Sequence, residues 1–299
     1  MMGFIMLVKK IIVPFLLALF AMSVFLLWAS SQGGGIPAFS SNVPLNIGIK
    51  LLLFNLSWVL ALSAPFAVLF ASMYVQRTSE RPIKAVTAAF KPSILFALVL
   101  AALFFFHNSY ILPNANHLAK VYVIAIRSGR LDRLSMNPDY LAGRGDREMT
   151  LSQFIREIEQ LDARIASLKI RQDGRSKLDV ATLRRVEREE LFEMQKGPML
   201  SASIIVMSLL GILIGSVIRH SIPTKIVFSL VLFGIFWIVF AYSSNLSDRL
   251  AETSSLSVAC VWLPILVVTI VTIPLFFWLG HRIAVSNARM EKMPPSTNA

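Results

Sequence analysis

Cysteine and charged residues are both scarce in this chain of 299 residues. Cys260 is the only cysteine and lies in an apolar run, which excludes an intrachain disulfide framework and a cysteine-based metal site. Only 15% of the residues are charged, whereas 56% are hydrophobic, and the mean hydropathy is +0.67. Soluble globular domains do not have this balance. The composition therefore predicts an integral membrane protein.

Sequence motifs for catalysis are also missing. The chain has no GxxxxGK[ST] or GxGxxG phosphate-binding motif and no GxSxG nucleophile elbow. Its four histidines, His107, His117, His220 and His281, form no HExxH motif and no closely spaced ligand pair. We therefore predict a protein that is not an enzyme, hydrolyses no ATP itself and uses no cofactor or metal.

Six apolar runs are long enough to cross a bilayer as helices, which takes about 20 residues each. They are residues 11–29, 51–75, 93–112, 198–218, 224–244 and 258–279. The interiors of these runs contain no charged residue, and Lys225 at the start of the fifth run is counted among the flanking bases. The lack of charge inside the spans disfavours an ion-coupled pump. A signal peptide is the alternative for the first run, but that run exceeds the usual h-region of about 7 to 15 residues.

The predicted fold class is therefore an all-α integral membrane protein with six transmembrane helices in a 3+3 arrangement. Residues 1–112 form helices one to three, and residues 113–197 form an external, mostly helical segment. Residues 198–280 form helices four to six, and residues 281–299 form a tail.

Lysine and arginine are distributed unequally between the two sides of the predicted bundle. The N-terminus, the loop 76–92, the turn 219–225 and the tail together carry eleven of them, whereas the short segments on the other side carry only Lys50 and Arg249. The positive-inside rule then places both termini in the cytoplasm. The net charge of +12 is explained by this topology, so we expect no nucleic-acid partner.

Part of the external segment has the pattern of a helical hairpin, at about residues 150–195. Apolar residues recur every three or four positions from Thr150 to Lys169, and Thr150 with Gln153 has the spacing of a capping box. Gly174 supplies a turn. The hairpin is interpreted either as a self-packed unit on the membrane surface or as a docking surface for an external partner.

The second helix of this hairpin is predicted to begin at Asp179, with an ion pair between Arg185 and Glu189. Upstream, the run Val121 to Ile126 is strand-like and is followed by loop residues. One strand is too little for a sheet domain.

Three further features are candidates for function. Pro65 lies in the middle of the second run and should kink its helix, either to line a moving cavity or simply for packing. Lys50, at the outer mouth of that run, either meets a lipid phosphate or extends to the interface. The loop 77–93 contains an Ala-rich stretch, 84–90, which is either an interfacial helix for a cytoplasmic subunit or a solvated connector.

Several short stretches of the sequence resemble one known family. Residues 64–71, APFAVLFA, are similar to its span-two motif lPlavLlA, and residues 108–116, NSYILPNAN, resemble the stretch that closes its span three. Residues 151–158 resemble the helix before its span four, and Trp262-Leu263-Pro264 resembles its WlP. With three spans on either side of a large external segment, the chain resembles the LptF/LptG (YjgP/YjgQ-type) family of lipopolysaccharide-export permeases.

This resemblance implies a multi-pass protein of the bacterial inner membrane that serves as permease subunit of an ABC transporter. It would extract lipopolysaccharide, or a similar anionic lipid, for export to the outer membrane. Its implied partners are a cytoplasmic ATPase dimer, a second permease subunit of the same family and a periplasmic bridge protein. The implied lipid-binding residues are Lys50 and Pro65, and the implied ATPase-coupling residues are Arg77, Glu80, Arg81, Lys84 and Ala88.

Two departures from the family pattern favour an alternative. The family inserts a periplasmic jelly roll after span three, and residues 113–149 are too few for its eight strands. In the coupling helix, Phe90 replaces the family's glycine, and Glu80 is displaced from the position of its glutamate. The alternative is a non-transporting membrane scaffold or regulator that binds an envelope protein through the hairpin.

Overall fold

The computed structural model describes residues 2–32, 43–75, 82–129, 148–171, 174–217, 222–250 and 256–291. Within these ranges every regular element is a helix. The helices are α1 (Met2–Gln32), α2 (Leu45–Val75), α3 (Pro82–Phe106), the π-helix η3 (His107–Ile111), α4 (Leu112–Ser128), α5 (Leu151–Arg171), α6 (Gly174–Val217), α7 (Ile222–Leu250), α8 (Leu256–Ala259), the 3-10 helix η7 (Cys260–Trp262) and α9 (Leu263–Glu291).

Among the described residues, six helical stretches are long and apolar enough to cross a membrane. They are residues 10–29, 45–75, 90–128, 179–216, 222–247 and 256–275. Each predicted apolar run overlaps one of these stretches. The chain is an all-α multi-pass membrane protein, as the sequence predicted.

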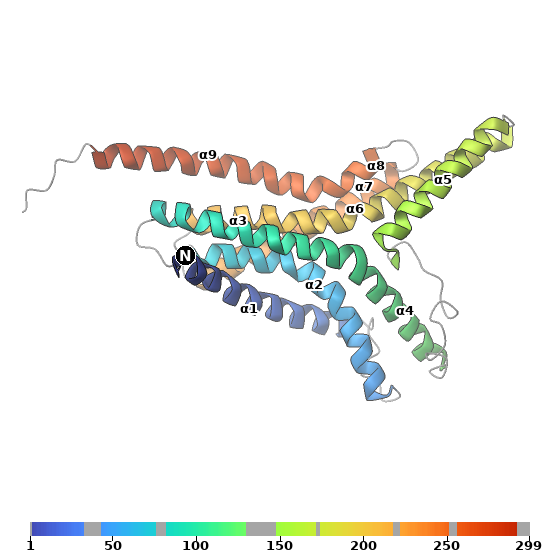
Figure 1. The fold of residues 1–299 in the computed structure, drawn as a ribbon, viewed down its shortest axis with the longest axis horizontal. Helices are drawn as coiled ribbons and strands as arrows, with labels where there is room; N and C mark the ends of the chain where they lie inside the picture. The colour runs from blue at the N-terminus through green and yellow to red at the C-terminus, as the bar shows by residue number, and fades with distance from the viewer. Residues whose placement is uncertain are drawn as a thin grey trace, which may run out of the picture.

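The two ends of the bundle differ (Figure 1). We call the end where α1 begins and α9 finishes the terminal end, and the end from which α4 and α5 extend the hairpin end. α5 runs along the first part of α6 and forms the predicted helical hairpin with it. The capping box is confirmed, because the backbone N–H of Thr150 donates to Oε1 of Gln153 at 2.8 Å.

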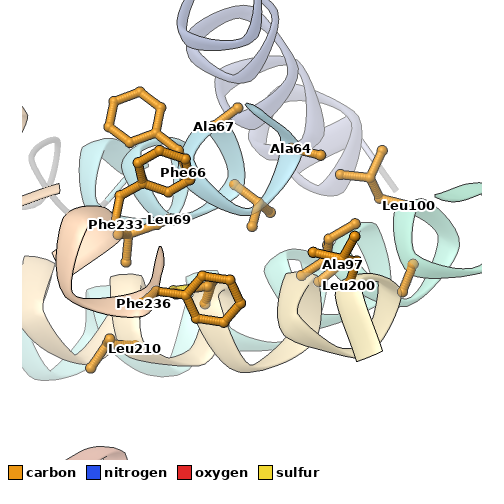
Figure 2. Packing of buried hydrophobic residues seen from close by; sticks show 14 of the residues in the cluster. Ala64, Phe66, Ala67, Leu69, Ala97, Leu100, Leu200, Leu210, Phe233 and Phe236 are labelled. Atoms are coloured by element: carbon orange, nitrogen blue, oxygen red, sulfur yellow. The ribbon is translucent and has the colours of Figure 1, made fainter. Parts of the chain in front are cut away.

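α6 is the central helix and packs against α2, α3, α5 and α9. Its approach to α2 is close: Ser72 and Ser208 are hydrogen-bonded at 3.0 Å, and Gly211 faces the backbone of Leu69. Figure 2 shows the apolar packing beside this contact, with Phe66 of α2 next to Phe233 of α7. Small residues allow membrane helices to approach closely in this way.

Two sequence predictions for the external segment are wrong. The run Val121–Ile126 is helical, because α4 continues from α3 through η3 and ends only at Gly129, whose φ of 66° stops it. Asp179 does not begin a helix, since α6 starts at Gly174 and continues without a break through Pro198. The predicted pair of Arg185 and Glu189 is present at 2.8 Å.

Candidate functional site

A cavity of about 430 Å³ lies near the hairpin end, where α2, η3, α4, α5, α6 and α7 meet. Its volume falls in the range of small-molecule sites, about 300–1,000 Å³. The lining residues are Trp58, Ala61, Leu62, Asn108, Ser109, Leu112, Pro113, Asn116, Met149, Leu151, Phe154, Glu193, Met194, Lys196, Gly197, Leu200, Trp237, Phe240, Ala241 and Ser244. Residues from both halves of the chain therefore form one site.

The apolar wall of the cavity is fixed by aromatic packing along α7. The ring of Trp237 lies edge-on to Phe233, Phe236 and Phe240, with centroid distances of 5.8, 5.6 and 5.1 Å. Phe233 in turn packs on Phe66 of α2 at 5.5 Å. Edge-to-face contacts of this kind add to the burial energy and restrict ring orientation. The wall is therefore held in place by contacts behind it.

A charged pair provides the polar side of the cavity. Nζ of Lys196 donates to Oε1 of Glu193 one turn earlier on α6, and the side chains are 18% and 19% exposed. The same ammonium lies 4.8 Å from the centroid of the Phe192 ring. A pair that is only partly desolvated leaves the ammonium able to meet another anion.

The π-helix η3 carries a chain of hydrogen bonds beside the cavity. Nε2 of His107 lies 2.9 Å from Oγ of Ser57 on α2, and Nδ1 lies 3.1 Å from Oδ1 of Asn108. Asn108 donates to Oγ of Ser201 on α6 at 3.4 Å, and Ser201 donates to the Gly197 carbonyl at 2.9 Å. Single π-turns inside α-helices often occur at functional sites. Here the turn connects α2 to α6 through polar side chains.

Two covered polar atoms belong to residues of this lining. Oγ of Ser109 and Nε1 of Trp237 are buried and have no hydrogen-bond partner among the described residues. An unsatisfied buried donor costs about 1–3 kcal/mol. An indole N–H is a donor only, so it requires an acceptor. These two covered groups therefore add an energetic cost to the packing beside the cavity.

The two predicted lipid-binding residues lie in different places. Lys50 is exposed on α2 and does not line the cavity. Pro65 is buried, and it lacks the N–H that would bond to the carbonyl of Ala61, which does line the cavity. α2 is visibly bent in Figure 1, in agreement with the predicted kink.

The predicted coupling segment is only partly covered by the structure. Arg77, Glu80 and Arg81 lie outside the described residues. Lys84 and Ala88 lie in the first turns of α3, which begins at Pro82 and runs directly into the third span. The Ala-rich stretch is therefore helical, and whether a cytoplasmic subunit binds it stays a prediction.

Two features of the structure were not predicted from the sequence. Glu193 and Lys196 precede an apolar run by only a few residues and were indistinguishable from its flanking charges. Lys225, counted as a flanking base, is 1% exposed, and its Nζ donates to the Met73 carbonyl of α2 at 2.9 Å. A lysine buried in this way is a signal in itself, because burial of a charged group is costly unless the group is hydrogen-bonded.

His107 and His117 do not share a site. His107 contacts Ser57, whereas Nδ1 of His117 lies 3.0 Å from Oε2 of Glu148. Nζ of Lys120 lies 3.0 Å from the other oxygen of that carboxylate. This second cluster ties α4 to the residues just before α5.

No protein-family model, no curated protein sequence and no solved structure matches this chain. The site must therefore be interpreted from its own geometry, and the resemblance to the LptF/LptG family stays a prediction.

Proposed function

We propose that the protein is the transmembrane permease subunit of an ABC transporter for an amphipathic lipid such as lipopolysaccharide. The observation that carries this proposal is the cavity, which combines a rigid apolar wall with an ion pair. An amphiphile has both kinds of surface. Its acyl part would lie against Trp58, Leu62 and Phe240, and its head group would face Lys196.

In the proposed orientation both termini are cytoplasmic, as the distribution of basic residues indicates. The cavity then lies in the periplasmic half of the inner membrane, from which lipid would leave for the outer membrane. A cytoplasmic ATPase dimer would act at the start of α3, and a second subunit of the same kind would complete the pair. Nucleotide would shift the population between a cavity that holds lipid and one that is closed.

The bent helix α2 offers a route for this coupling. Pro65 interrupts its hydrogen bonding one turn from the cavity, and the same helix is bonded to α7 by Lys225 near the terminal end. A movement received at the terminal end would then change the angle of the α2 segment that bears Trp58 and Ala61.

The first experiment is affinity purification of the tagged protein from native membranes in mild detergent, with mass spectrometry of what co-purifies. Recovery of an ABC-type ATPase in near-stoichiometric amount supports the permease. Recovery of envelope proteins without any ATPase would overturn it and would support the scaffold, whose docking surface is the hairpin of α5 and α6 that extends beyond the bundle (Figure 1).

A second experiment addresses the cavity directly. Ala241, an exposed lining residue of α7, is replaced by tryptophan to fill the cavity. The matched control is Ala102→Trp, because Ala102 is also exposed, on α3, and does not line the cavity. We expect less co-purified lipid, and less lipid-stimulated ATP hydrolysis by the complex, for Ala241→Trp alone. Equal behaviour of the two variants would remove the cavity from the mechanism.

A further inference from the structure

A second cavity, of about 500 Å³, lies between α3, α6 and α9. We call it the α9 groove. Its floor is formed by Val206, Leu209 and Leu213 of α6, which are spaced to lie on one helix face. Phe90 of α3 and residues 269–277 of α9 form the walls. The groove shares no lining residue with the first cavity.

The surface of the α9 groove is entirely apolar. Of the two threonines in its wall, Thr272 directs its hydroxyl to the carbonyl of Val268 in its own helix, at 2.7 Å. Its floor and most of its walls lie in stretches that are apolar enough to cross a membrane. An acyl chain in the groove would therefore meet only apolar side-chain surface, in a volume of about 500 Å³.

Exposed polar residues lie close in the chain to those lining residues of the α9 groove that are nearest the terminal end. Lys91 follows the lining residue Phe90 directly and is exposed. His281 lies one helical turn beyond the lining residue Phe277 and is also exposed. Figure 1 shows the start of α3 and the last turns of α9 at the same end of the bundle. An exposed cation thus directly follows the α3 residue that forms one wall of the groove.

We infer that the α9 groove binds an anionic phospholipid, with one acyl chain against α6 and its phosphate near Lys91. Basic pockets between transmembrane helices are suited to phosphate head groups, and the burial of each methylene adds to the affinity. The positive charge of Lys91 selects an anionic lipid over a zwitterionic one. This site lies toward the opposite end from the first cavity, and it does not rest on the proposed transport function.

The test uses the purified full-length chain in detergent, titrated with phosphatidylglycerol or with phosphatidylcholine of the same acyl chains, and read by native mass spectrometry. Thr269→Phe fills the groove, and its control is Ile270→Phe at the neighbouring position, which is 59% exposed. Lys91→Gln removes the cation, and its control is Lys10→Gln, an exposed lysine of α1 at the same end.

We expect phosphatidylglycerol to bind more tightly than phosphatidylcholine. Lys91→Gln should weaken the binding of phosphatidylglycerol about fivefold, which is the effect of one basic residue near a membrane surface. The binding of phosphatidylcholine should not change. Thr269→Phe should weaken both lipids by at least about tenfold, the effect of withdrawing two methylenes from apolar contact. Neither control should change binding.

Two results would overturn the inference. If Thr269→Phe and Ile270→Phe bind lipid equally well, the acyl chain does not occupy the groove and contacts the protein only as bulk lipid does. An equal effect of Lys91→Gln and Lys10→Gln would mean that head-group attraction is not tied to this groove. The lysine variants alter exposed side chains only, so their outcome stands even if Thr269→Phe does not fold. Because no ATPase is present, failure here leaves the proposed function untouched.

Discussion

Replacing Gly211 by alanine tests whether the close contact between α2 and α6 determines the stability of the bundle. A Cβ atom at this position would lie 2.5 Å from the carbonyl oxygen of Leu69 and 2.8 Å from Cβ of Ser72. The first neighbour is backbone, which cannot rotate away, so the helices must separate. Overpacking of this kind costs about 1–3 kcal/mol.

The matched control is Gly234→Ala in α7, where an added Cβ meets no atom within 4 Å. Both substitutions replace glycine inside a helix and gain helix propensity, up to about 1 kcal/mol each. The difference in the free energy of unfolding between the variants is therefore the steric cost alone. At roughly 2–4 °C per kcal/mol, Gly211→Ala should melt at least about 2 °C below Gly234→Ala.

The chain provides its own reporter for this measurement. Cys260 is the only cysteine and is 7% exposed, so a thiol-reactive fluorogenic dye labels the protein only as it unfolds. Both variants are melted in the same detergent, with wild type alongside. If Gly211→Ala melts at or above the temperature of Gly234→Ala, the contact between α2 and α6 is not as close as described.

Three further substitutions test separate contacts. Lys225→Ala removes a buried charged donor and should destabilise the protein by about 1.5–3 kcal/mol in the same melting assay. Lys50→Ala, at an exposed position, should change the stability by no more than about 0.5 kcal/mol. Equal losses of stability would contradict the burial of Lys225. Gln153→Ala removes the capping bond and should cost about 0.3–1.5 kcal/mol, seen as faster amide exchange in the first turn of α5, and unchanged exchange there would exclude the cap. Gly129→Ala places alanine at φ 66° and should speed amide exchange in the last turn of α4. Gly129→Asn should leave this exchange nearly unchanged, because asparagine adopts the left-handed conformation more readily. Equal exchange in the two variants would show that the left-handed turn is not required.

The spans were predictable because each contains about twenty apolar residues, a length that fits a bilayer and few other structures. The first turn of α5 was predictable for a local reason, since Thr150 and Gln153 are three residues apart and need only each other. By contrast, Val121–Ile126 is short and rich in β-branched residues, so its pattern alone does not separate strand from helix. It is helical because it continues the helix that α3 and η3 have already formed.

The cavity was beyond prediction because its walls come from segments that are distant in sequence. Trp58, Asn108, Lys196 and Trp237 each look ordinary in their own surroundings, and only the packing of α6 against α2 and α7 brings them together. Lys225 is the same case, since its partner carbonyl lies 152 residues away. Pro65 was the exception, because proline alters its own helix wherever that helix packs.

The unbroken course of α6 has a mechanical consequence. With 44 residues at about 1.5 Å each, the helix is about 66 Å long, and it contains both one arm of the hairpin with α5 and a stretch apolar enough to cross a membrane. One face contributes to the cavity and another forms the floor of the α9 groove. A displacement of the hairpin would therefore tilt α6 as a single rod and move both cavity linings together. Pro198 is the position where the helix can bend and so reduce this movement.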